Sequence, residues 1–122
     1  MTEASLYERL GGEESIRAIV TDIVALHHAN PAINARYDNA KKSDAELIKL
    51  VVELIGSGTG GPQEYTGMSM PEAHKGMNVN EAEFVAVVDD ILEAMVKNGV
   101  GEREKADMLA IAYGMKNDIV HL

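Results

Sequence analysis

Apolar residues recur at intervals of three to four along most of this chain, and this helical period constrains the fold more than any other feature of the sequence. The period runs through residues 13–28, 44–55, 81–98 and 102–118, each with a charged face opposite the apolar one. No segment shows the sustained alternation of a half-buried strand. The length of 122 residues allows one hydrophobic core rather than two, so the sequence predicts a single all-α domain over residues 1–122.

Capping residues and glycines mark where these helices begin and end. Ser43 and Asn80 each stand three residues before a glutamate, which is the pattern of a capping box. The glycine-rich segment 56–62 is expected to stop the preceding helix and to act as a flexible connector, because no phosphate-loop lysine follows it and no strand precedes it. Residues 32–42 are expected to be irregular, with Ile33 as one inward anchor.

The stretch 69–77 predicts a short helix that presents one histidine. Ser69 can cap its start, with Glu72 three residues later, and Gly76 supplies a left-handed residue to end it. A helix of about two turns is not stable alone in water, so packing against another part of the chain must hold it. From the residues alone, His74 is either a partly buried structural histidine or a ligand beside an apolar slot, as haem iron requires.

Composition narrows the cofactors that the chain can use. Aromatic residues make up only 4% of the chain, so either aliphatic side chains fill the core or a flat apolar cofactor supplies the missing area. The absence of cysteine excludes disulfides, cysteine-ligated zinc, iron–sulfur clusters and thiol catalysis. No histidine pair has the spacing of a zinc site.

Charge and hydropathy narrow the partners. A net charge of −9 without a basic patch disfavours both nucleic acid and anionic membrane as partners. No apolar run approaches the length of a membrane span, and residues 1–5 lack the pattern of a secretory signal. We therefore expect a soluble, cytoplasmic protein.

Four stretches resemble the group I truncated haemoglobins, in order and at matching spacing: residues 6–12 (LYERLGG), 65–67 (YTG), 70–77 (MPEAHKGM) and 83–88 (EFVAVV). The resemblance covers nearly the whole chain. It implies a two-over-two α-helical sandwich around one haem b, iron protoporphyrin IX. It also implies that His74 is the proximal iron ligand.

The same resemblance implies which other residues surround the haem. Phe84 and Met77 would touch the porphyrin, and Met70 also flanks the histidine helix. Lys75 is a candidate to pair with a haem propionate, although the basic residue that often follows the Tyr-x-Gly motif is Met68 here. The full candidate set for cofactor binding is His74, Tyr37, Ile48, Lys49, Met70, Lys75, Met77 and Phe84.

On the opposite, distal side of the haem, the chain departs from the family pattern. The usual Phe-Tyr pair of the second helix, whose tyrosine hydroxyl hydrogen-bonds the gas ligand, reads Ile23-Val24. The usual Phe-Phe pair before the third helix reads Arg36-Tyr37, with Tyr37 expected to face inward. Polar positions of the third helix, often glutamine, map to Ala45, Ile48 and Lys49. Tyr37 and Lys49 are therefore the candidate donors to a gas ligand.

Lys49 has a second candidate role, as an internal sixth ligand to the iron. Desolvation lowers the pKa of a lysine, and a neutral amine can coordinate ferric iron. The alternative is an exposed side chain at the edge of the helix. His28 lies one helical turn after Val24 and is another distal candidate, but for His27 and His28 a structural role at the helix end is the simpler interpretation.

These observations leave three functions open. The first is a haem protein that coordinates diatomic gases (O₂, NO, CO) at an open iron position, served by a partner reductase. The second is a six-coordinate redox or gas-sensing haem protein. The third is a helical interaction module without haem. The family allows NO dioxygenation, but the missing tyrosine argues against efficient turnover, so enzymatic activity stays open. We expect a monomer or a weak dimer.

Overall fold

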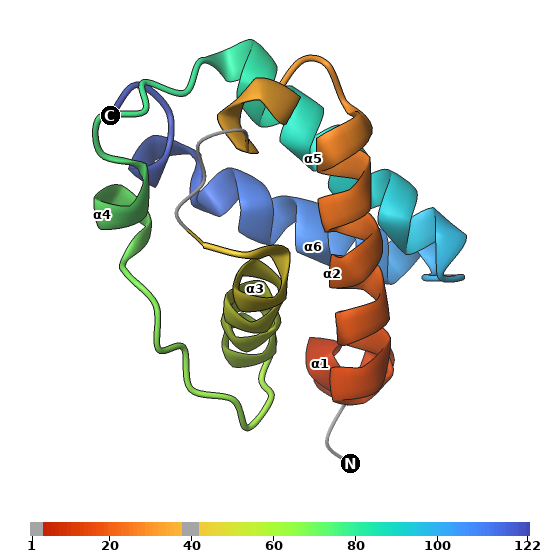
Figure 1. The fold of residues 1–122 in the computed structure, drawn as a ribbon. Coiled ribbons are helices and arrows are strands. Elements are labelled where there is room, and N and C mark those ends of the chain that lie inside the picture. The colour runs from red at the N-terminus through yellow and green to blue at the C-terminus, as the bar shows by residue number, and fades with distance from the viewer. Residues whose placement is uncertain (1–3, 38–41) are drawn as a thin grey trace.

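The computed structural model describes residues 4–37 and 42–122, which form six α-helices and two single-turn 3₁₀ helices (Figure 1). In chain order these are α1 (Leu6–Arg9), α2 (Gly12–Ala29), η1 (Asn34–Tyr37), α3 (Asp44–Gly58), α4 (Met70–His74), α5 (Glu81–Lys97), α6 (Glu102–Gly114) and η2 (Lys116–Asp118). Within the described ranges there is no strand, only an isolated bridge between Val79 and Val120. The all-α prediction is confirmed.

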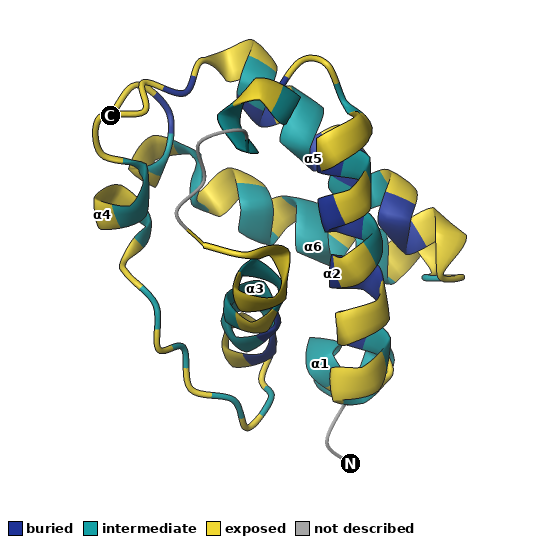
Figure 2. Cartoon of the chain, viewed as in Figure 1, coloured by how far each residue is buried: buried dark blue, intermediate teal, exposed yellow. Residues whose placement is uncertain are grey.

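The long helices form two pairs. Helix α2 packs against both α3 and α5, and α5 packs against α6, which gives the predicted two-over-two arrangement. Where these elements meet, the core is almost entirely aliphatic, and α2 turns its buried face toward it (Figure 2). The buried members of this cluster are Leu10, Ile16, Ile19, Val20, Ile23, Val52, Ala94 and Met95.

The predicted caps are present. The Ser43 hydroxyl accepts a hydrogen bond from the amide of Glu46 at 3.2 Å. Asn80 and Glu83 form a reciprocal capping box at the start of α5. These bonds satisfy amides that have no partner inside their helix, and so they fix where α3 and α5 begin.

The prediction that the glycine-rich segment stops the helix of residues 44–55 at Gly56 is wrong, because α3 continues through Gly56 to Gly58. Gly56 is buried, and a Cβ atom there would lie only 2.3 Å from Oε1 of Gln63. This glycine therefore allows the following loop to pack closely rather than breaking the helix. The left-handed residue comes later, at Gly60, whose φ is 93°.

Two other boundaries differ from the prediction. Helix α4 covers only Met70–His74, because Lys75 already has extended ψ (128°). Helix α6 ends at Gly114, and 3₁₀ helix η2 carries the chain on to Asp118. Ile33 is buried as expected, while residues 38–41 of the segment predicted to be irregular lie outside the described residues. No helix in the described ranges is long and apolar enough to cross a membrane.

Candidate functional site

His74 is held in one orientation by its own helix. The Ser69 hydroxyl accepts from the amide of Glu72 at 3.3 Å and so caps the start of α4. At the other end, Nδ1 of the half-buried His74 lies 2.8 Å from the carbonyl oxygen of Met70. A carbonyl only accepts, so Nδ1 carries the proton in the neutral ring and Nε2 keeps a free lone pair. Within residues 4–37 and 42–122, Nε2 has no hydrogen-bond partner.

The C-terminus fastens the segment that follows His74. The amide of Asn78 donates to the carbonyl of Leu122, and the amide of His121 donates to the carbonyl of Val79, each at 2.8 Å. Helix α4 also contacts η2, and Figure 1 shows the C-terminus close to the segment that joins α4 to α5. Packing against the C-terminal segment therefore holds the short helix in place, as its length requires.

An apolar wall lies next to this segment. Phe84 is buried on α5, and the ring of Tyr113 meets it edge-on with 5.3 Å between centroids. Phe84 packs with Val120, which follows η2. Met70 is half-buried, whereas Met77 is 37% exposed. The apolar candidates from the sequence thus range from core to surface.

Lys75 and Ile48, two further members of the candidate set, differ in exposure. Lys75 is exposed, and its ammonium group forms no ion pair with a described residue. Ile48 is half-buried on α3 and packs against the aliphatic core. Lys75 is therefore free to meet an acidic group, and Ile48 adds apolar surface.

Tyr37 packs against both histidines at the end of α2. Its ring centroid lies 6.0 Å from that of His27 and 4.9 Å from that of His28. Burial raises the pKa of Tyr37, and the charges of Asp90 and Asp44 raise it further. The hydroxyl therefore stays protonated near neutral pH, and it has no hydrogen-bond partner among the described residues.

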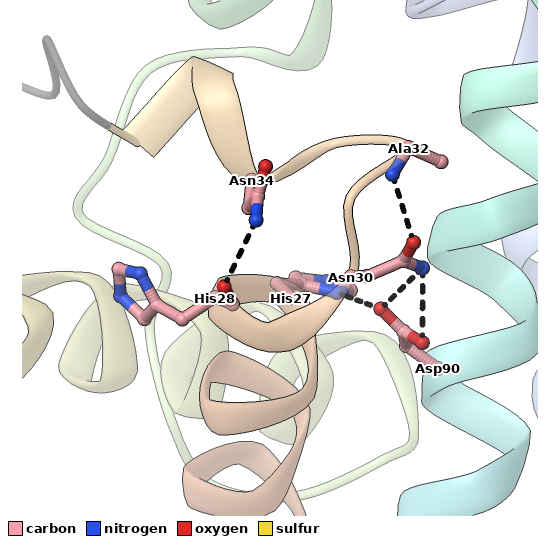
Figure 3. Close-up of polar contacts among 6 residues, drawn as sticks. All are labelled: His27, His28, Asn30, Ala32, Asn34 and Asp90. Atoms are coloured by element: carbon pink, nitrogen blue, oxygen red, sulfur yellow. Dashed lines mark hydrogen bonds and ion pairs between the residues drawn. The ribbon is translucent and has the colours of Figure 1, made fainter.

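His27 and Asp90 form a buried polar pair between α2 and α5 (Figure 3). His27 Nδ1 lies 2.7 Å from Asp90 Oδ2, and the side-chain amide of Asn30 donates to the same carboxylate. Burial lowers the pKa of His27, and this outweighs the opposing pull of Asp90. His27 is therefore a neutral donor to Asp90, so its role is structural, although its partner was not predicted.

His28, which also contacts the ring of Tyr37, lies at the surface. Its Nε2 is 2.9 Å from the carboxylate of Asp44, the first residue of α3. This contact links the end of α2 to the start of α3. His28 thus makes a structural contact at the end of α2, but with a carboxylate and not with the helix-end carbonyls that were the expected partners.

Arg36 links η1 to the start of α5 and to the turn after α4. Its guanidinium bonds both carboxylate oxygens of Glu83, with 2.8 Å from Nη2 to Oε1, and Nη1 donates to the carbonyl of Met77 at 3.1 Å. The hydrogen bonds from Arg36 hold the pKa of Glu83 below its ordinary value. The carboxylate therefore stays ionised and keeps the pair intact.

Lys49 does not have the desolvated environment that an internal iron ligand needs. Its side chain is 68% exposed, and its ammonium group lies 3.9 Å from the carboxylate of Glu53. The exposed alternative is therefore the one observed for Lys49. Nearby, Ile23 and Val24 are buried and offer no polar group.

Sequence reasoning missed two acidic residues at these contacts. Asp90 lies between Val87 and Ile91 on the inward face of α5, so a carboxylate within the apolar period was the available signal. Glu83 was recognised only as part of a cap, and nothing in the local pattern predicted its pairing with Arg36. Both contacts join segments that are distant in the sequence.

These features define a class of protein: a small helical sandwich that presents a half-buried histidine, with one free ring nitrogen, at the end of a short helix. Residues 5–121 match the family model described as Bacterial-like globin, and the chain belongs to this family. Members of the truncated globin family typically bind haem and gaseous ligands.

Similar proteins support the narrower resemblance to group I truncated haemoglobins. The Group 1 truncated hemoglobin of Tetrahymena pyriformis is 29% identical over 79% of this chain and 78% of its own length. The Group 1 truncated hemoglobin GlbN of a Nostoc species is 27% identical over 97% of this chain and 98% of its own length. The crystal structure of the Tetrahymena pyriformis protein in its Fe(III) form superposes with a TM-score of 0.92 at 24% identity, covering 98% of this chain and 100% of that one. At this identity the superposition shows the shared fold.

Proposed function

We propose that this chain is a haem-binding truncated globin in which Nε2 of His74 would hold the iron and the haem would bind a diatomic gas. The observation that carries this proposal is the bond between His74 Nδ1 and the carbonyl of Met70 at 2.8 Å. Ligating histidines usually donate their other ring N–H to a carbonyl or carboxylate, which fixes the tautomer and the ring orientation. The free Nε2 of His74 fits an iron ligand, and family membership supports the same assignment.

The surrounding residues fit an apolar cofactor with acidic groups. Phe84 and half-buried Met70 would line one face of haem b, and exposed Lys75 would meet a propionate. Haem b, when bound, supplies an iron that coordinates O₂, NO or CO. The protein's own part is to hold the His74 ring, to exclude water with apolar side chains, and to offer a donor to the gas.

Tyr37 is the better candidate for that donor. Its hydroxyl is protonated and has no partner among the described residues, whereas the ammonium group of Lys49 faces Glu53 at the surface. A sixth ligand from Lys49 would first have to break that contact and desolvate the amine. We therefore propose an open gas-binding position. Cytoplasmic localisation, a partner reductase and a monomer or weak dimer stay predictions.

The test is a titration of the purified protein with hemin, followed by absorption spectra of the ferric, ferrous and ferrous–CO forms. Wild type is expected to take up one equivalent, and His74→Ala is expected to bind loosely with an altered ferrous spectrum. His121→Asn is the matched control, because His121 is exposed and has a left-handed φ of 64°, which asparagine tolerates.

Each result decides between the functions that the sequence left open. Equal binding by wild type and His74→Ala would remove the proximal assignment. A six-coordinate spectrum of wild type without added ligand would favour the redox or sensing function. A protein that gains no Soret band with hemin would be an interaction module. Loss of binding in His121→Asn as well would mean that the effect is not specific to His74.

A further inference from the structure

We propose that Arg36 is a positioning residue for His74, acting through the carbonyl of Met77. The inference rests on the proposed function, since it concerns the same histidine. It goes beyond that function, because it assigns the orientation of the proximal ligand to a residue of η1, an element well before α4 in the sequence. Arg36 stands where the resemblance to truncated haemoglobins implies phenylalanine, so the family pattern does not predict this role.

Arg36 uses three of its N–H groups on two separate segments. Nε and Nη2 donate to the two carboxylate oxygens of Glu83, and Nη1 donates to the carbonyl of Met77 at 3.1 Å. Such a fork is pre-organised, so two of its bonds fix the plane and direct the third. Only arginine can make this set of contacts, because the five donors of a guanidinium are rigidly arranged.

The carbonyl that Arg36 holds belongs to the turn that closes α4. The amide of Met77 donates to the carbonyl of His74 at 3.0 Å, so Met77 is directly bonded to the backbone of the proposed ligand. Between them lies Gly76, with a φ of 84°, and Asn78 follows with a φ of 46°. Glycine adopts this conformation without steric cost, but Asn78 adopts it against the preference of a residue with a Cβ atom, so the turn needs restraints from outside.

Two restraints hold the turn, from different directions. The C-terminal segment bonds Asn78 and Val79, as described above, and Arg36 bonds Met77. Glu83 is itself held in place, because its carboxylate also accepts a hydrogen bond from the backbone amide of Asn80 at 3.1 Å. Arg36 is thereby anchored to the start of α5. Removal of Arg36 leaves only the C-terminal segment to restrain the turn. The backbone next to His74 then moves more freely, and so does the ring that it carries.

The experiment compares Arg36→Met with wild type and with Arg17→Met. Arg17 is exposed on α2 and its guanidinium forms no hydrogen bond or ion pair with a described residue, so both variants lose one positive charge but only the first loses the restraint. Amide hydrogen exchange of residues 75–79 is measured in the haem-loaded and haem-free proteins. Haem loss is measured by transfer to excess apomyoglobin.

We expect Arg36→Met to speed exchange at residues 75–79 about tenfold and haem loss by a similar factor, which corresponds to about 1.4 kcal/mol. Arg17→Met is expected to match wild type in both. A merely structural role for Arg36 would raise exchange throughout the chain and not selectively at residues 75–79. That uniform rise, or unchanged exchange at these residues, would overturn the inference.

The two proposals fail in different ways. If wild type takes up no hemin, the proposed function is wrong, and the exchange arm on the haem-free protein still tests the restraint. If wild type binds hemin and Arg36→Met loses it at the wild-type rate, only the positioning role is wrong. The ferrous iron–histidine stretching frequency adds a direct readout, which we expect to shift in Arg36→Met and not in Arg17→Met.

Discussion

His27 places a neutral histidine in the core, and this makes stability depend on pH. Burial lowers its pKa from 6.5 in the folded state. Below pH 6.5 the unfolded chain binds a proton that the folded chain does not yet bind, so the free energy of unfolding falls as the pH falls from 6.5 toward the folded pKa. Well above pH 6.5 His27 is neutral in both states, so it no longer lowers the free energy of unfolding.

The variant His27→Asn isolates this effect. Its amide keeps a donor near the position of Nδ1, facing Asp90, but does not titrate. We expect urea unfolding between about pH 7.5 and about pH 5 to show a smaller loss of stability in this variant than in wild type. An equal loss in both proteins would mean that carboxylates, and not His27, set the pH dependence.

At the same scale, sequence reasoning found the residues whose signal is local. The short helix that carries His74, its Ser69 cap and the left-handed Gly76 were all predicted from a window of nine residues, 69–77. The bond to the carbonyl of Met70 was not predicted, although it comes from the same window, because it depends on the side-chain rotamer. Residue types fix which group is present, but not which way it turns.

At the scale of the elements, the backbone conformation of the glycines at the ends of α3 and α4 can be tested. Gly76→Ala forces a left-handed φ of 84° on alanine and is expected to lower the free energy of unfolding by roughly 1–2 kcal/mol. Nothing lies within 4 Å of the added Cβ atom, so the cost is one of backbone conformation alone.

Gly58→Ala is the matched control, measured in the same urea unfolding series. Gly58 is the last residue of α3, and a Cβ atom there also meets nothing within 4 Å. The helical backbone accepts alanine, so we expect unchanged or slightly raised stability. Similar losses in both variants would show that the conformation at Gly76 is not the cause.

The element boundaries show where sequence reasoning stops. Starts were predicted well, because caps are local: Ser43 and Asn80 each bond within three residues. The end of α3 was misplaced, because the reason for Gly56 is the side chain of Gln63, which packs against it from the following loop. A glycine that breaks a helix and a glycine that admits a neighbour look the same in a sequence.

At the scale of the whole molecule, α5 contributes the carboxylates of two long-range polar pairs, one with Arg36 and one with His27. The N-terminal turn of α5 carries Glu83, which binds Arg36, and the next turns carry Asp90, which binds His27. The fold class was predicted from helical period and from family motifs, both of which run the length of the chain. These long-range polar pairs were not, because a partner on another helix leaves no periodic trace.

Exogenous imidazole tests directly whether Nε2 of His74 ligates the iron, as we propose. His74→Gly removes the side chain, and free imidazole can restore the missing nitrogen. We predict that haem-loaded His74→Gly has an altered ferrous spectrum, that added imidazole restores the wild-type spectrum, and that pyrrole, which lacks the basic nitrogen, does not. A wild-type spectrum from His74→Gly without imidazole would contradict the claim.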